Sequence, residues 1–189
     1  MERSTESQLI ERCQQGELNQ FGVLYDTYIK KIYDFIYYKT HHRQTAEDLT
    51  SHTFLKALRS INSFSNTAGT FQAWLYQIAR NTVIDHYRTQ KATVNLEDAW
   101  DLHDNTDIVR DTDTALKLET VQAALQQLSS EQRDIVLLRV WSGLSYAEIA
   151  AIVGKTEDSC KVSFSRTIKK LREQNALLAL LLFMISIVR

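Results

Sequence analysis

Apolar residues recur every three or four positions along most of the chain, which is the period of an amphipathic α-helix. Within residues 18–40 they fall at Phe21, Leu24, Tyr28, Ile32, Phe35 and Ile36. Similar spacing predicts helices over 9–14, 45–61, 71–88 and 114–128. Thr45 is the expected N-cap of the helix over 45–61, because acidic residues follow it in the first turn. The polar stretch 62–70 predicts a turn between two helices.

The last third of the chain carries the most specific local signals. Ser129-x-x-Gln132 and Ser145-x-x-Glu148 both fit a capping box, which predicts helices over 130–143 and 146–153. Gly154 is suited to a left-handed turn, and Thr156 is the expected cap of the helix that follows. A short helix, a glycine-containing turn and a longer basic helix together predict a helix-turn-helix motif.

The basic helix has two chemically different faces. Its expected inward face carries Cys160, Phe164, Ile168 and Leu171, and its opposite face carries Asp158, Val162, Ser165, Arg166 and Lys169, flanked by Lys161. Cations suit phosphates or guanine edges, and a valine suits a thymine methyl group in the major groove. The alternative interpretation is a solvated basic helix in a small bundle.

Composition supports an all-α protein. The 189 residues include no proline and only five glycines, too few for the turns of a sheet protein. Cys13 and Cys160 are far apart, so neither a disulfide framework nor a cysteine zinc site is expected. The amino-terminal stretch has no apolar signal region, so we expect a cytoplasmic protein.

Charge is distributed in blocks. Residues 21–91 carry nine Lys and Arg against five Asp and Glu, residues 95–113 carry seven acids against one Arg, and residues 155–172 carry six basic residues against two acids. We interpret this as two domains, 1–91 and 114–175, joined by an acidic linker, 92–113. A single domain with a long charged loop is the alternative. The apolar tail, 176–189, does not fit the pattern of either domain.

No arrangement of residues predicts catalysis. The sequence has no evident nucleophile–base set, glycine-rich phosphate loop or pair of catalytic carboxylates, so we expect no enzyme and no cofactor. His41, His42 and His52 lie near Asp48 in the sequence, but Asp48 and His52 belong to an otherwise ordinary amphipathic helix. No metal site is therefore predicted.

Two long stretches resemble a known family. LSSEQRDIVLLRVWSGLSYAEIAAIVGKTEDSCKVSFSRTIKKLRE is similar to region 4 of bacterial RNA polymerase sigma factors. AEDLTSHTFLKALRSINSF, followed by FQAWLYQIARNTVIDHYR, resembles region 2. The more specific pattern is W-L-x-x-I-A-x-N-x-x-x-D-x-x-R, at Trp74, Leu75, Ile78, Ala79, Asn81, Asp85 and Arg88. Both regions in a short chain resemble the extracytoplasmic-function class.

The resemblance implies three binding surfaces. Core RNA polymerase would be bound through its β′ clamp helices by Asp48, Leu49, Thr53 and Phe54, although Ser51 and His52 depart from the usual Gln-Glu. The unpaired −10 strand would be bound by Phe64, Asn66, Phe71, Trp74, Arg80, Asn81 and Arg88. The −35 duplex would be bound by Thr156, Asp158, Lys161, Val162, Ser165, Arg166 and Lys169.

Several of these assignments have structural alternatives. Phe71 and Trp74 also fit a helix core, and Asn81 and Asp85, four residues apart, also fit a mutual surface hydrogen bond. Further expected partners are the polymerase β flap and an anti-sigma factor. The 24 residues from Ala92 to Ala115, ~80 Å when extended, would let the two domains read separate promoter elements.

The carboxy-terminal tail is apolar but short. Residues 176–188 are 13 mostly apolar positions, fewer than the about 20 that span a bilayer as a helix. We expect a helix packed on the protein or covered by a partner, with membrane association as an alternative.

Two other function classes are alternatives to a sigma factor. A stand-alone helix-turn-helix regulator would need only residues 114–173. An anti-sigma protein would not be expected to carry both basic domains in sigma order.

Overall fold

The computed structural model describes residues 3–67, 69–93 and 123–173, and it divides the chain into two units, Met1–His103 and Asp104–Arg189. Every regular element in the described ranges is helical, as the sequence predicts. The predicted linker and apolar tail fall largely or wholly outside these ranges. None of the described helices is both long enough and apolar enough to cross a membrane.

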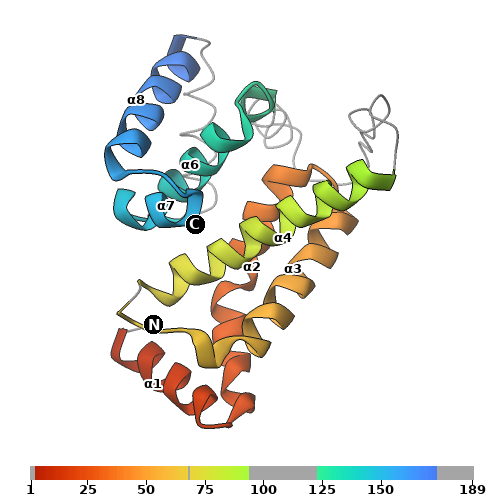
Figure 1. Cartoon of the computed structure of the whole chain (residues 1–189), viewed down its shortest axis with the longest axis vertical. Helices are drawn as coiled ribbons and strands as arrows, with labels where there is room; N and C mark the ends of the chain where they lie inside the picture. Colours follow the sequence, from red (N-terminus) through yellow and green to blue (C-terminus); the bar gives the residue numbers. More distant parts are fainter. Residues whose placement is uncertain (1–2, 68, 94–122, 174–189) are drawn as a thin grey trace, which may run out of the picture. The chain divides into compact units, whose positions relative to one another are not determined.

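Unit 1 is a bundle of helices. It contains α1 (Arg3–Gln14), η1 (Leu18–Gln20), α2 (Phe21–Thr40), α3 (Arg43–Arg59), η2 (Ile61–Ser63) and α4 (Phe71–Thr93). Helices α2, α3 and α4 all contact one another and run side by side in Figure 1. Helix α1 packs against α2 and η2.

The core of unit 1 follows from the apolar period of its helices. Leu24, Ile32 and Ile36 of α2 are fully buried and share the interior with Leu75 and Tyr76 of α4. The Tyr76 ring meets the Phe35 ring edge to face, with 5.2 Å between the ring centroids. An edge-to-face contact of this kind is a favourable packing geometry for aromatic rings.

The predicted N-cap of α3 is wrong. The cap is His42, whose backbone is extended and whose Nδ1 accepts a hydrogen bond from the Thr45 N–H at 3.1 Å. Thr45 lies inside the first turn, and its hydroxyl is 2.9 Å from the same nitrogen. The helix therefore begins at Arg43, with its cap three residues earlier than predicted. Helix α4 continues to Thr93, five residues beyond the predicted end.

Unit 2 contains α6 (Ser130–Val140), α7 (Tyr146–Val153) and α8 (Glu157–Glu173), which all contact one another. Both predicted capping boxes are confirmed at Ser129 and Ser145. The left-handed turn is confirmed at Gly154, with φ 72° and ψ 39°. Residues 123–126 are helical, whereas the rest of the helix predicted over 114–128 lies mainly outside the described residues.

The helix-turn-helix geometry is set by these caps. The Thr156 hydroxyl accepts a hydrogen bond from the Ser159 N–H at 3.2 Å, so the predicted cap of α8 is confirmed. Because an N-cap satisfies donors that have no partner within the helix, it fixes where the helix begins. This local cap thereby determines the residue at which α8 begins. It also determines on which face of α8 each side chain lies.

Candidate nucleic-acid and polymerase interfaces

Helix α8 has the two faces that the sequence predicts. Cys160 and Leu171 are fully buried, and Phe164 and Ile168 are half-buried. Thr167 is also buried on this side, which the apolar pattern missed, and its hydroxyl donates to the Ser163 carbonyl at 2.8 Å. All residues predicted for −35 binding are exposed: Thr156, Asp158, Lys161, Val162, Ser165, Arg166 and Lys169.

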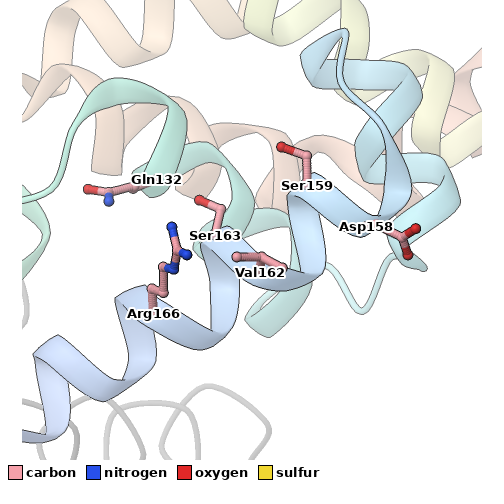
Figure 2. Close-up of a pocket in the computed structure, with 6 residues that line it drawn as sticks. All are labelled: Gln132, Asp158, Ser159, Val162, Ser163 and Arg166. Atoms are coloured by element: carbon pink, nitrogen blue, oxygen red, sulfur yellow. The ribbon is translucent and has the colours of Figure 1, made fainter.

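An open hollow of about 400 Å³ lies along the exposed side of α8. Its lining comprises Gln132 of α6 and Asp158, Ser159, Val162, Ser163 and Arg166 of α8. Figure 2 shows the Arg166 side chain extending toward Gln132 and Ser163, with Asp158 at the other end of the hollow. Gln132, Ser159 and Ser163 were not predicted as site residues, because contact between α6 and α8 is not encoded in the period of either helix.

The Gln132 side chain is held in place by the backbone of Ser129. Its side-chain Oε1 accepts from the Ser129 N–H at 3.1 Å, and the Ser129 hydroxyl accepts from the Gln132 N–H at 3.2 Å. The capping box therefore also fixes one wall of the hollow.

The charge of Lys161 is partly compensated within α8. Its ammonium lies 2.8 Å from the Glu157 carboxylate and 3.6 Å from the Asp158 carboxylate. The hydrogen bond to Glu157 raises the pKa of Lys161, so this cation remains charged but is already paired. Arg166 and Lys169, further along the helix, carry the remaining positive charge of the predicted −35 face.

A chain of contacts connects α6, α7 and α8. The Arg139 guanidinium donates to the Leu144 carbonyl at 2.8 Å and lies over the Tyr146 ring, 4.7 Å from its centroid. The Tyr146 ring meets the Phe164 ring of α8 with 5.9 Å between the centroids. Lys155, in the turn before α8, pairs with Glu131 of α6 at 3.2 Å.

Helix α4 of unit 1 presents an exposed stripe, defined here by Gln77, Asn81, Ile84 and Arg88. Their spacing of four, three and four places them on one side of the helix. Trp74, three residues before Gln77, is half-buried at the end of the stripe, and Arg80 is half-buried beside it. Ile84 was not predicted as a site residue. Asp85, which the sequence left as a possible partner of Asn81, pairs instead with Lys56 and Arg88.

The three aromatic residues predicted to contact the −10 strand differ in burial. Phe64 and Phe71 are buried, and their rings meet edge to face with 5.5 Å between centroids. Trp74 packs against both, at 5.3 Å from Phe64 and 5.5 Å from Phe71. In this conformation Phe64 and Phe71 therefore support the surface from below, and Trp74 is the member of the cluster that reaches it.

The turn that carries Asn66 is held by hydrogen bonds from Gln14, which was not predicted as a site residue. The Gln14 amide of α1 donates to the Ile61 carbonyl at 3.0 Å and to the Phe64 carbonyl at 2.9 Å. Asn66 itself is exposed. Gln14 thus joins the end of α1 to η2 and to the residue that follows it, about 50 positions along the chain.

Three of the four residues predicted to bind polymerase through α3 are buried in the structure. Asp48 is exposed, but Leu49, Thr53 and Phe54 are buried in unit 1, with at most 5% of each residue exposed. The Phe54 ring packs against Tyr25 of α2, with 4.8 Å between centroids. The exposed face of α3 instead carries Asp48, His52, Leu55 and Arg59, of which Leu55 is a large apolar side chain.

Among the described residues, no group of three or more His, Cys, Asp and Glu side chains is arranged to hold a metal ion. The chemistry of the exposed faces is that of recognition: amides and hydroxyls for hydrogen bonds, cations for phosphates, and isolated apolar groups for bases or a protein partner. The fold and these faces define a two-domain helical protein with a helix-turn-helix in its second domain.

Comparison with known proteins identifies the class. The model of sigma-70 region 2 matches residues 24–93, and a model of sigma-70 region 4 matches residues 118–171. The chain is 31% identical over 166 residues to the ECF RNA polymerase sigma factor SigX of Bacillus subtilis, and the aligned region covers 84% of each chain. It is 38% identical over 168 residues to the ECF RNA polymerase sigma factor BldN of Streptomyces coelicolor, covering 87% of this chain and 63% of BldN.

Solved structures agree with this assignment. Sigma factor RpoE, determined in complex with the anti-sigma factor NepR from Bartonella quintana, matches with a TM-score of 0.70 at 28% identity, covering 81% of this chain and 94% of that one. CnrH, determined in complex with the cytosolic domain of CnrY, shares the fold, with a TM-score of 0.67 at 22% identity, covering 88% and 94% of the two chains. The chain belongs to the extracytoplasmic-function class of the sigma-70 family. A stand-alone helix-turn-helix regulator does not fit, because unit 1 matches region 2.

Proposed function

We propose that this sigma factor binds core RNA polymerase and directs it to promoters, with unit 1 reading the melted −10 strand and unit 2 reading the −35 duplex. The observation that carries the proposal is a feature common to the two units. Each presents a helix whose exposed face combines cations and hydrogen-bonding groups with a large exposed apolar side chain, Ile84 on α4 and Val162 on α8.

The −35 assignment rests on the exposed face of α8. Arg166 has the reach and the two-pronged guanidinium needed to bond the O6 and N7 atoms of guanine, and Val162 offers an apolar contact for a thymine methyl group. Thr156, Asp158, Lys161, Ser165 and Lys169 surround them on the exposed side. We include Gln132, Ser159 and Ser163 in this surface, because they line the same hollow (Figure 2).

The −10 assignment rests on the stripe of α4 and the turn before it. A single strand needs cations along its backbone and flat or apolar surfaces for its bases. Arg80 and Arg88 supply charge, Asn81 and Asn66 supply amides, and Trp74 and Ile84 supply stacking surface. Phe64 and Phe71 act indirectly, because they hold Trp74 at the surface.

Core polymerase is assigned to the exposed face of α3. Asp48, His52, Leu55 and Arg59 form it, and an exposed leucine among polar residues is a typical anchor for a protein partner. Leu49, Thr53 and Phe54 would keep that face in shape from inside. We further propose that unit 2 binds the β flap, that an anti-sigma protein regulates the chain, and that it acts in the cytoplasm. The solved complex of RpoE with NepR supports the second of these points.

The experiment is run-off transcription with core enzyme on a library of random promoters, using three substitutions of matched exposure. Leu55, Ile84 and Val162 are 48%, 41% and 47% exposed, so Leu55→Asp, Ile84→Asp and Val162→Asp should all fold. Each substitution places the same charge on a different proposed surface.

The three variants should fail at different steps. Leu55→Asp should compete poorly for core enzyme, whereas the other two should compete normally. Val162→Asp holoenzyme should bind a duplex containing the selected upstream element weakly, and Ile84→Asp holoenzyme should bind it normally yet transcribe poorly. Normal transcription by all three folded variants, or one common defect in all three, would contradict the proposed division of the surfaces.

A further inference from the structure

Arg88, at the end of the α4 stripe, forms an ion pair within its own helix. Its guanidinium lies 3.2 Å from the Asp85 carboxylate, one turn earlier on the same helix. The Asp85 carboxylate also lies 3.6 Å from the Lys56 ammonium of α3. One carboxylate is therefore shared by two cations from two helices.

The two cations differ in how they are held. The Lys56 ammonium also donates to the Thr82 hydroxyl at 3.3 Å, and Thr82 is buried, so Lys56 is anchored on α4 at two points. The Arg88 side chain is 79% exposed, against 49% for Lys56 and 47% for Asp85. Arg88 is therefore the partner that can leave Asp85, whereas Lys56 is the partner that stays.

We propose that Asp85 and Lys56 are positioning residues that control how readily Arg88 binds a DNA phosphate. In the free chain Asp85 competes with phosphate for Arg88. When a strand arrives, Arg88 passes to the phosphate, and Lys56 remains to neutralise Asp85, which would otherwise repel the strand. This inference rests on the proposed role of α4 in binding single-stranded DNA.

The proposal predicts opposite effects from two neighbouring substitutions. Asp85→Asn removes the competitor for Arg88 and should tighten binding of single-stranded DNA. Lys56→Met leaves Asp85 dependent on Arg88 alone and should weaken binding, although Lys56 does not itself contact the strand. Because exposed ion pairs are weak, we expect changes of about two- to five-fold in each direction. The effect of Asp85→Asn should shrink as salt rises, because salt screens the pair.

The test uses the full chain and a fluorescein-labelled pool of random 12-nucleotide single strands, with anisotropy titrations at low and at physiological salt. Glu17→Gln is the matched control for net charge. Glu17 is also 47% exposed, but it pairs with Arg12 at 2.6 Å, next to α1 rather than on α4. It should change affinity far less than Asp85→Asn.

A double-mutant cycle distinguishes a positioning role of Lys56 from direct contact between Lys56 and the strand. Lys56→Met/Asp85→Asn should bind like Asp85→Asn alone, and Asp85→Asn should have no effect in an Arg88→Met background. Equal weakening by Lys56→Met with and without Asp85 would mean that Lys56 contacts the strand itself, which overturns the proposal. Unchanged binding by Asp85→Asn would overturn it as well. Both results are compatible with a functional sigma factor, which the run-off experiment tests independently.

Discussion

Gln14 offers a direct test of how α1 supports the proposed −10 surface. Its amide donates two hydrogen bonds, to the Ile61 and Phe64 carbonyls, at the base of the turn that carries Asn66. The substitution Gln14→Met keeps the length of the side chain and removes the donors, so it isolates the hydrogen bonds from the packing.

The expected cost follows from those two bonds. A hydrogen bond inside a protein contributes about 1 kcal/mol net, and an acceptor left without a donor costs somewhat more. The Ile61 carbonyl keeps a donor in the Phe64 N–H at 3.1 Å, so this additional cost concerns the Phe64 carbonyl. Gln14 is half-buried, so water partly replaces it. We expect Gln14→Met to lower the free energy of unfolding of unit 1 by about 1–3 kcal/mol.

The assay must report on unit 1 alone, because a two-domain chain does not unfold in one step. Replacing Trp100 and Trp141 with Phe leaves Trp74 as the only tryptophan, and its ring packs on Phe64, the residue whose carbonyl Gln14 binds. Urea unfolding followed by Trp74 fluorescence therefore measures the relevant unit. Gln15→Met, at the exposed next position, is the matched control and should change the unfolding free energy by less than about 0.5 kcal/mol.

The functional consequence should be selective. Gln14→Met should reduce transcription at a temperature where unit 1 remains folded, while competition for core enzyme stays normal, because α3 is unaffected. A Gln14→Met variant that is as stable as Gln15→Met would refute the reasoning, since the two hydrogen bonds would then contribute nothing.

Three further predictions concern single positions. Gly154→Ala should lower the urea stability of unit 2 by about 1–2 kcal/mol, because φ there is 72° and the cost is one of backbone conformation, with open space around the added methyl. Burial lowers the pKa of His86 in the folded chain. Its contribution to stability is therefore complete above the unfolded pKa of about 6.5 and is lost as pH falls through the lower folded pKa. In urea titrations, His86→Gln should lose less unit 1 stability on acidification than the unsubstituted chain does. Arg166→Met should relax preference at one upstream base pair by about 1–3 kcal/mol in holoenzyme binding to a set of single-substitution duplexes, whereas uniform weakening with a shallower salt dependence would instead assign Arg166 to a phosphate.

Features that depend on neighbouring residues could be predicted from the sequence. The capping boxes at Ser129 and Ser145, the cap at Thr156 and the turn at Gly154 each involve residues within a few positions of one another. The cap of α3 was missed because its acceptor is a histidine ring nitrogen, which is not among the usual capping groups.

Features that depend on packing between helices could not be predicted. Helix α3 carries apolar residues on more than one side, so the sequence alone does not tell that Phe54 faces inward and Leu55 outward. Buried threonines add to this ambiguity. The Thr53 hydroxyl donates a hydrogen bond to the Leu49 carbonyl at 2.7 Å, so this polar residue can be buried without leaving its donor unpaired. Gln14 was missed because its acceptors lie about 50 positions away.

The contacts from Arg139 through Tyr146 to Phe164 have a consequence for evolution and engineering. They hold α8 by its inner face, whereas Val162, Ser165 and Lys169 take no part in them. Substitutions at these three exposed positions therefore leave those contacts intact. If this face reads the −35 duplex as proposed, a change of target sequence requires substitutions only at such outer positions, and a laboratory can derive regulators with different targets from one scaffold in the same way.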